Sequence, residues 1–172
     1  MKGRVWVFGD NISTDHIIPG RFMDKVGVIP DEDWKKYCFI DHEPRFSGEA
    51  QPGDIIVAGK NFGTGSSREV APFAIKMAGI SCIIAQSYAR IFFRNCINLG
   101  LPAVTADPEF IAALEHLDET ALDLATGKAI LSKSGREFKI EPLAPFAGEI
   151  VNNGGLLKYA LLKRKNRGEQ NE

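Results

Sequence analysis

The sequence is poor in residues that hold metals. Only three of its 172 residues are cysteines, Cys38, Cys82 and Cys96, and no two of them form a Cys-x-x-Cys pair. Its three histidines show no His-x-x-x-His spacing. An iron–sulfur cluster needs about three or four thiolates and a structural zinc about four ligands. We therefore expect this chain to bind no metal or cofactor itself, so that any metal in its chemistry comes from another chain.

Long apolar runs and an excess of one charge are also absent. No stretch approaches the roughly 18–20 apolar residues of a membrane helix, and the first residues lack the apolar core of a signal peptide. Lysine plus arginine (21) balance aspartate plus glutamate (22), which argues against binding to nucleic acid or anionic lipid. We expect a cytoplasmic protein with reduced, buried cysteines. The basic residues between 158 and 167 are expected to be a solvated helix end.

The middle of the chain alternates between short apolar strands and helices. Such alternation predicts a parallel sheet with right-handed crossovers. The expected strands are residues 54–58, 82–85 and 102–105. The helices after them are expected to end at Gly79, to run from a cap at Ser87 to Gly100, and to start at Asp107-Pro108.

Other patterns flank this βαβαβ region. A strand is expected at residues 4–8, and residues 11–53 are irregular apart from a short helix at 31–37. Three short strands, at 122–126, 129–132 and 136–141, and a helix from about 155 to 163 complete the chain. We expect one α/β domain over residues 1–172, in which the parallel layer is joined to an antiparallel β layer. Residues 164–172 are expected to form a flexible tail.

The most informative segment is GKNFGTGSSRE, residues 59–69. It follows a strand, has three glycines in its first seven residues and brings Ser66, Ser67 and Arg68 to the start of a helix. Glycines let a ligand approach the backbone. A helix start offers unpaired N–H groups, and Arg68 adds a two-pronged donor. These features indicate a site for a carboxylate or phosphate.

The same residues also fit a purely structural role. Ser66 to Glu69 has the pattern of a capping box, although Pro72 disfavours a regular helix there. A Walker A loop is excluded because Gly-Lys-Ser/Thr is missing. A nucleophile elbow is excluded because no glycine stands two residues beyond either serine. The local pattern leaves the anion site and the cap both open.

A second polar segment, DNISTDH at residues 10–16, follows the first strand. Its Asx and Ser/Thr residues are typical of turns. Alternatively, Asp15 orients an arginine and His16 relays protons. The segment alone does not decide between these interpretations.

Together these segments resemble the small subunits of isopropylmalate dehydratase and homoaconitase, which correspond to the mobile C-terminal domain of aconitase. The resemblance rests on DNISTDHIIPGRF, GKNFGTGSSREVAPFAIKMAG, IAQSYARIFFRNCINLGLP and GGLLKY, in this order along the chain. It implies a swivelling β/β/α fold and a hydro-lyase that moves a hydroxyl between adjacent carbons of a malate-type acid. It also implies a large-subunit partner that carries a [4Fe-4S] cluster, in a heterodimer or heterotetramer, and without which this chain is inactive.

The resemblance also implies roles for individual residues. Ser66 would be the base that removes the proton beside a carboxylate, and Asp15 would support the arginine. The substrate-binding residues would be Ser67, Arg68, Gly65, Thr64, Arg21 and His16. Many relatives have histidine where this chain has Val70, so any role of that imidazole is missing here. The assignment fits the chemistry, because proton loss beside a carboxylate needs concentrated positive potential and hydroxide needs a Lewis acid to leave.

The residues after Gly20 are expected to select the substrate. Arg21 would reach its distal group, and an apolar side would come from Phe22, Met23 and Val26. This favours 2-isopropylmalate, converted to 3-isopropylmalate in leucine biosynthesis, over homoaconitate or a dimethylmalate- or citraconate-type acid. The alternative of another class is a non-catalytic module that binds an anion or phosphate.

Overall fold

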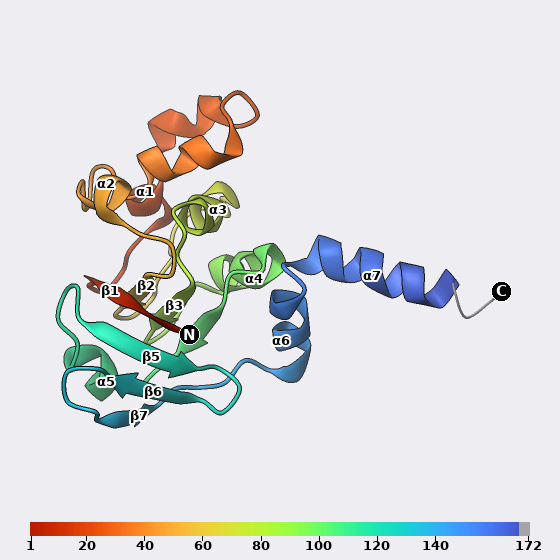
Figure 1. Ribbon diagram of the computed structural model, residues 1–172. Helices are drawn as coiled ribbons and strands as arrows, with labels where there is room; N and C mark the ends of the chain where they lie inside the picture. The colour runs from red at the N-terminus through yellow and green to blue at the C-terminus, as the bar shows by residue number, and fades with distance from the viewer. Residues whose placement is uncertain (169–172) are drawn as a thin grey trace.

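A seven-stranded mixed sheet organises the chain, for which the computed structural model describes residues 1–168 (Figure 1). The strands are β1 (Lys2–Phe8), β2 (Ile55–Ala58), β3 (Cys82–Ala85), β4 (Ala103–Thr105), β5 (Glu119–Asp123), β6 (Lys128–Leu131) and β7 (Glu137–Lys139). The α-helices are α1 (Thr14–Ile17), α2 (Phe46–Glu49), α3 (Val70–Met77), α4 (Arg90–Leu99), α5 (Pro108–Ala112), α6 (Pro145–Asn152) and α7 (Leu156–Gly168). Two 3-10 helices are η1 (Gly20–Lys25) and η2 (Asp31–Tyr37).

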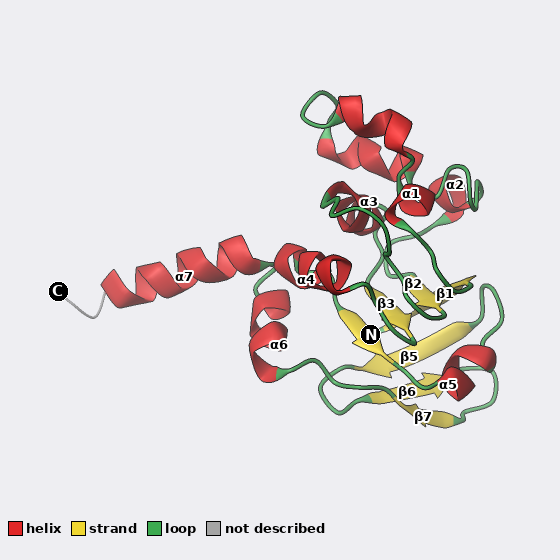
Figure 2. Ribbon diagram, turned by 180° about the vertical axis from the view of Figure 1, so that it is seen from behind, coloured by secondary structure: helices red, strands yellow, loops and turns green. Residues whose placement is uncertain are grey.

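The sheet has a parallel half and an antiparallel half, and β1 belongs to both. The strand order is β4-β3-β2-β1-β5-β6-β7. β1 runs parallel to β2, with Val5 opposite Ile55, and its first residues run antiparallel to β5, with Lys2 opposite Ala121. The predicted βαβαβ layer joined to an antiparallel layer is therefore confirmed. In Figure 2 the antiparallel strands lie on the side of the sheet away from α3 and α4.

Each face of the parallel half is buried, because helices cover one face and the curled antiparallel half covers the other. Ile56 and Ile83 lie in the core cluster that includes residues of α3 and α4. Ile55 and Ile84 point the other way and join a second cluster with Phe110 of α5. Burial on both sides explains why these strands are uniformly apolar in sequence rather than alternating.

Several helices were not expected from the sequence, and one expected helix cap is absent. Residues 11–53 contain α1, η1 and α2 besides the expected helix at 31–37, and α6 was not predicted. These elements are short, so they offer too few turns for a helical period to be recognised. Ser87 does not cap α4, which begins at Arg90, and its hydroxyl instead accepts a hydrogen bond from the Asn61 N–H at 2.9 Å.

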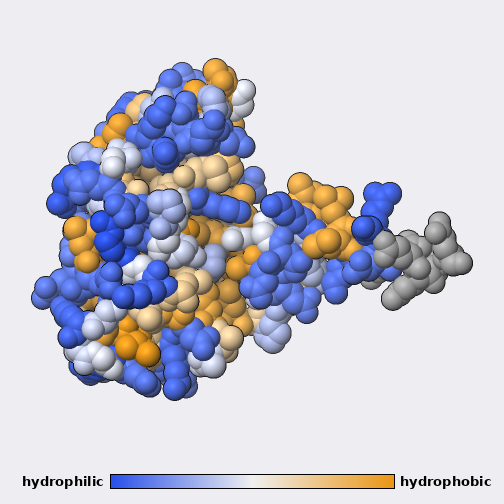
Figure 3. Space-filling view, viewed as in Figure 1, coloured by the Kyte–Doolittle hydropathy of each residue, from blue (hydrophilic) through white to orange (hydrophobic). Residues whose placement is uncertain are grey.

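Helix α7 projects from the body (Figures 1 and 2). It runs to Gly168, so residues 164–168 of the expected tail are helical, and residues 169–172 lie outside the described residues. Apolar surface gathers on this projection (Figure 3), where Leu157 and Leu161 are exposed.

Candidate active site

The two polar segments singled out in the sequence lie side by side at the carboxyl edge of the parallel strands. One follows β1 and the other follows β2, and these strands are neighbours. The Thr14 N–H donates to the Thr64 carbonyl at 2.8 Å, and the Gly63 N–H donates to the Ile12 carbonyl at 2.7 Å. Loops at the carboxyl ends of adjacent parallel strands are the usual place for a ligand site in such sheets.

Arg68 is held by Asp15 across these two segments. Its Nη1 lies 2.5 Å from Asp15 Oδ1 and 3.5 Å from the Ile18 carbonyl oxygen. The Arg68 side chain is 25% exposed, whereas that of Asp15 is 55% exposed. One end of the guanidinium is therefore fixed, while part of it still faces outward. This contact is the one that the family resemblance implied, and its role in catalysis remains a proposal.

Ser66 and Ser67 are exposed in the loop that precedes α3. Helix α3 begins at Val70, its N-cap residue is Glu69, and no side chain caps it. The capping-box alternative is therefore wrong for this segment. Pro72 is the third residue of α3, where a backbone N–H has no acceptor within the helix. The missing N–H of proline therefore costs the helix no hydrogen bond. Within residues 1–168 the backbone N–H groups of both serines have no protein acceptor, which leaves them available to an anion.

Two glycines of the loop are required by space and by backbone angles. Gly63 has φ +78°, and a Cβ at this position would lie 2.0 Å from Cγ of Phe92. Gly65 has φ +102°, and a Cβ there would lie 3.1 Å from the Thr14 hydroxyl oxygen. Only glycine tolerates both the positive φ angles and the close contacts. The loop after β2 can therefore lie close against α4 and against the loop that follows β1.

His16 has a structural role that the sequence did not show. Its backbone N–H donates to Ser13 Oγ at 3.1 Å, and its Nδ1 accepts from the Ser13 N–H at 3.1 Å, which forms a capping box on α1. Its ring stacks on His42, with 4.8 Å between centroids. Burial, and then the neighbouring His16, lower the pKa of His42. Nδ1 of His16 is therefore already occupied by a backbone N–H group. The expected proton relay or substrate contact of His16 stays a prediction.

Arg21 binds another residue of the same chain. Its Nη1 and Nη2 lie 2.5 and 2.7 Å from the two carboxylate oxygens of Asp41, and its guanidinium carbon lies 4.5 Å from the Phe22 ring centroid. Of the expected apolar side, Phe22 and Met23 pack partly against the core, whereas Val26 is exposed. Sequence reasoning missed Asp41, and the one available signal was a second Asp-His dipeptide like that at residues 15–16.

The cysteines do not fit an iron–sulfur cluster. All three are free and fully buried. Burial raises the pKa of the Cys82 thiol to about 12 and that of Cys38 and Cys96 well above the usual range. A cluster is bound by thiolates, so these protonated thiols are unsuited to it. Within residues 1–168 no three metal-ligating side chains gather, and no helix there is long and apolar enough to span a membrane.

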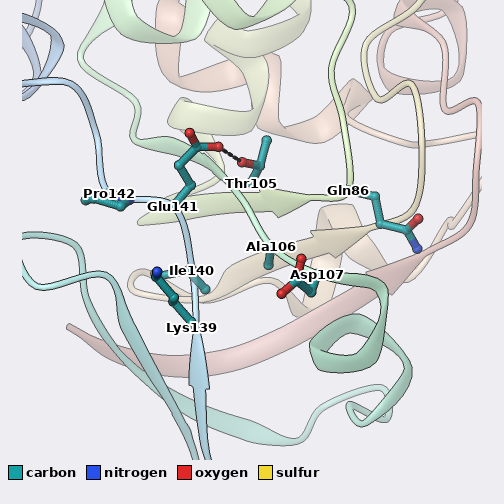
Figure 4. Close-up of a pocket in the computed structure, with 8 residues that line it drawn as sticks. All are labelled: Gln86, Thr105, Ala106, Asp107, Lys139, Ile140, Glu141 and Pro142. Carbon is teal, nitrogen blue, oxygen red and sulfur yellow. Dashed lines mark hydrogen bonds between the residues drawn. The ribbon is translucent and has the colours of Figure 1, made fainter.

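A concavity of about 440 Å³ lies at the carboxyl ends of β3 and β4 (Figure 4). In it the Thr105 hydroxyl donates to a Glu141 carboxylate oxygen at 2.6 Å. None of the predicted site residues lines it. The lining residues are Gln86, Thr105, Ala106, Asp107, Lys139, Ile140, Glu141 and Pro142.

Comparison with known proteins shows the family of this chain. The family described as aconitase C-terminal domain matches residues 10–109. The chain is 48% identical over 160 residues to the 3-isopropylmalate dehydratase small subunit of Aquifex aeolicus, covering 92% of this chain and 93% of that one. It is 46% identical to small subunit 2 of the same enzyme from Archaeoglobus fulgidus, with the same coverage.

A solved structure shares the fold. The crystal structure of 3-isopropylmalate dehydratase (LeuD) from Methanocaldococcus jannaschii superimposes with a TM-score of 0.89 at 37% identity, over 99% of this chain and 98% of that one. The sequence match and the shared fold cover the strands and loops that form the candidate site. The chain belongs to the aconitase C-terminal domain family.

Proposed function

We propose that this chain is the small subunit of a 3-isopropylmalate dehydratase, a hydro-lyase of leucine biosynthesis. The enzyme interconverts 2-isopropylmalate and 3-isopropylmalate by dehydration and rehydration. Relatives with 46–48% identity over 92% of the chain have this name. The observation that carries the proposal is the Arg68 guanidinium, which lies beside two exposed serines. Its Nη1 donates a hydrogen bond to Asp15 Oδ1 at 2.5 Å.

The proposal gives each of these groups a task. Arg68 clamps a substrate carboxylate, and Asp15 keeps the guanidinium in the required orientation. Ser66 removes the proton from the carbon beside that carboxylate. Ser67 and the free backbone N–H groups of the loop stabilise the negative charge that develops on the carboxylate oxygens. A neutral serine is a weak base, so Ser66 needs the same positive potential to act as an alkoxide.

The proposal divides the reaction between two chains. This chain supplies the groups for anion binding and proton removal, and its buried thiols are unsuited to hold a cluster. Loss of the hydroxyl needs a Lewis acid. We infer that a large subunit contributes it as a [4Fe-4S] cluster, in a heterodimer or heterotetramer. Free, buried cysteines also suit the reduced cytoplasm, where we place the enzyme.

Reconstitution with an iron–sulfur large subunit tests the proposal. We expect neither subunit alone to form the alkene from 2-isopropylmalate, and the mixture to form it, as followed by ultraviolet absorbance. Homoaconitate and dimethylmalate serve as competing substrates, and 2-isopropylmalate should give the highest kcat/KM. Full activity of the large subunit alone would remove this chain from the mechanism.

A further inference from the structure

Two Asp-His dipeptides from distant parts of the sequence face each other in the structure. They are Asp15-His16 on α1 and Asp41-His42 in the segment after η2. Their imidazoles stack with centroids 4.8 Å apart and planes inclined by 20°. The pKa of His42 is lowered, first by burial and then by His16. A neutral His42 ring can therefore stack without charge repulsion at neutral pH.

Each of the two aspartates binds one arginine. Asp15 binds Arg68 at 2.5 Å, and Asp41 binds both terminal nitrogens of Arg21, at 2.5 and 2.7 Å. The hydrogen bonds from Arg21 lower the pKa of Asp41, so this carboxyl is ionised at neutral pH. An arginine that is paired in this way offers its remaining N–H groups in a fixed direction.

The two arginine–aspartate pairs are linked at two points. The stacked rings of His16 and His42 connect the aspartates, since each ring is next in sequence to one of them. The backbone connects the arginines, because Gly20 precedes Arg21 and lies against the other pair. A Cβ placed on Gly20 would be 3.3 Å from Asp15 Oδ1 and 3.5 Å from Arg68 Nη2.

We propose that Asp41 is a positioning residue for Arg21, which it holds ready for the distal group of the substrate, and that the two arginine–aspartate pairs form one linked unit. The inference rests on the proposed function and adds a positioning residue to the same site. Fixing a guanidinium before binding reduces the entropy that the complex loses, so the benefit should be seen in substrate binding. His42 acts through its stack on His16, which keeps the two segments in register.

Steady-state kinetics of the assembled enzyme test the proposal. We expect Asp41→Asn to raise KM for 2-isopropylmalate about 3- to 10-fold with kcat nearly unchanged, the signature of lost uniform binding. Added to an Arg21→Gln variant, Asp41→Asn should have no further effect, because it acts only through that arginine. His42→Ala should raise KM, and His42→Phe, which keeps a flat ring, should restore it.

Glu43→Gln is the matched control. It breaks a neighbouring two-point pair, in which Arg45 donates to Glu43 at 2.9 and 3.2 Å, and it should leave KM unchanged. A lower KM in Asp41→Asn would mean that Asp41 competes with substrate, and equal effects of both variants would mean general loosening. Either result overturns the proposal.

The proposed function and this inference fail in different ways. An active wild type with unchanged KM in Asp41→Asn refutes only the positioning role. An inactive assembled wild type refutes the proposed function, and the substrate role of the unit with it. If the assembled wild type is inactive, nuclear magnetic resonance of the full chain still tests the Arg21–Asp41 pair. The Arg21 guanidinium signals should shift in Asp41→Asn and stay unchanged in Glu43→Gln.

Discussion

Replacing Gly63 by alanine should disturb the candidate site through one methyl group. The Cβ that Gly63→Ala introduces would lie 2.0 Å from Cγ of Phe92 and 2.5 Å from its Cβ and Cδ1. Carbon atoms in contact are normally roughly 3.5–4.0 Å apart. The Phe92 ring is buried in the main core, so either this ring or the loop has to move. Because the Gly63 N–H also binds the Ile12 carbonyl at 2.7 Å, movement would separate the two loops of the site.

The expected loss of stability can be estimated from two contributions. A side chain at φ +78° costs roughly 1–2 kcal/mol. Overpacking in a dense core typically costs about 1–3 kcal/mol. The free energy of unfolding should therefore fall by about 2–5 kcal/mol, and for a chain of this size the Tm by roughly 4–20 °C.

Calorimetry of the isolated chain measures the change in Tm, and turnover of the assembled enzyme at a temperature well below both transitions measures the change in the loop. We expect kcat/KM to fall even where Gly63→Ala is fully folded, since the serines and Arg68 lie just beyond the altered residue. Gly48→Ala is the control, because nothing lies within 4 Å of a Cβ there and its φ is not positive. Unchanged Tm and turnover in Gly63→Ala would refute the reasoning.

The remaining predictions concern the catalytic groups and one buried carboxylate. Ser66→Ala should lower kcat by about 10²–10⁴ with the fold intact, as expected for a positioned base; a full rate in the assembled enzyme would contradict this role. Arg68→Lys should mainly raise KM, because lysine cannot form the two-pronged contact, and an unchanged KM would exclude the clamp. Burial raises the pKa of Asp54, but hydrogen bonds from Arg4, Gln51 and Trp6 bring it below its ordinary value. Its stabilising contribution is therefore present above the unfolded pKa of about 3.9 and is lost as pH falls through the lower folded pKa. Asp54→Asn should lower the free energy of unfolding by about 1–3 kcal/mol at pH 7, and the difference from wild type should shrink in acid; a constant difference would contradict the linkage.

Local sequence was sufficient for the parts of the fold that repeat a period or a signature. The apolar run at residues 54–58 predicted a strand, which the structure has at Ile55–Ala58, and Asp107-Pro108 correctly marked the start of α5. The joining of parallel and antiparallel layers also followed from the order of the elements. Short helices such as α1 and α2 were missed because four residues give little more than one turn of pattern.

The sequence by itself determined the chemistry available to this protein: a glycine-rich turn with two serines and an arginine, an Asp-His loop, and too few thiolates for a cluster. The resemblance of these segments to a known family implied that Asp15 supports the arginine, and the structure shows the contact because β1 and β2 are neighbours and their loops meet at one edge of the sheet. Only the tertiary structure decided that Asp41 binds Arg21 and that His16 stacks on His42. These contacts join segments without a regular period, and their partners are fixed by how the whole chain packs.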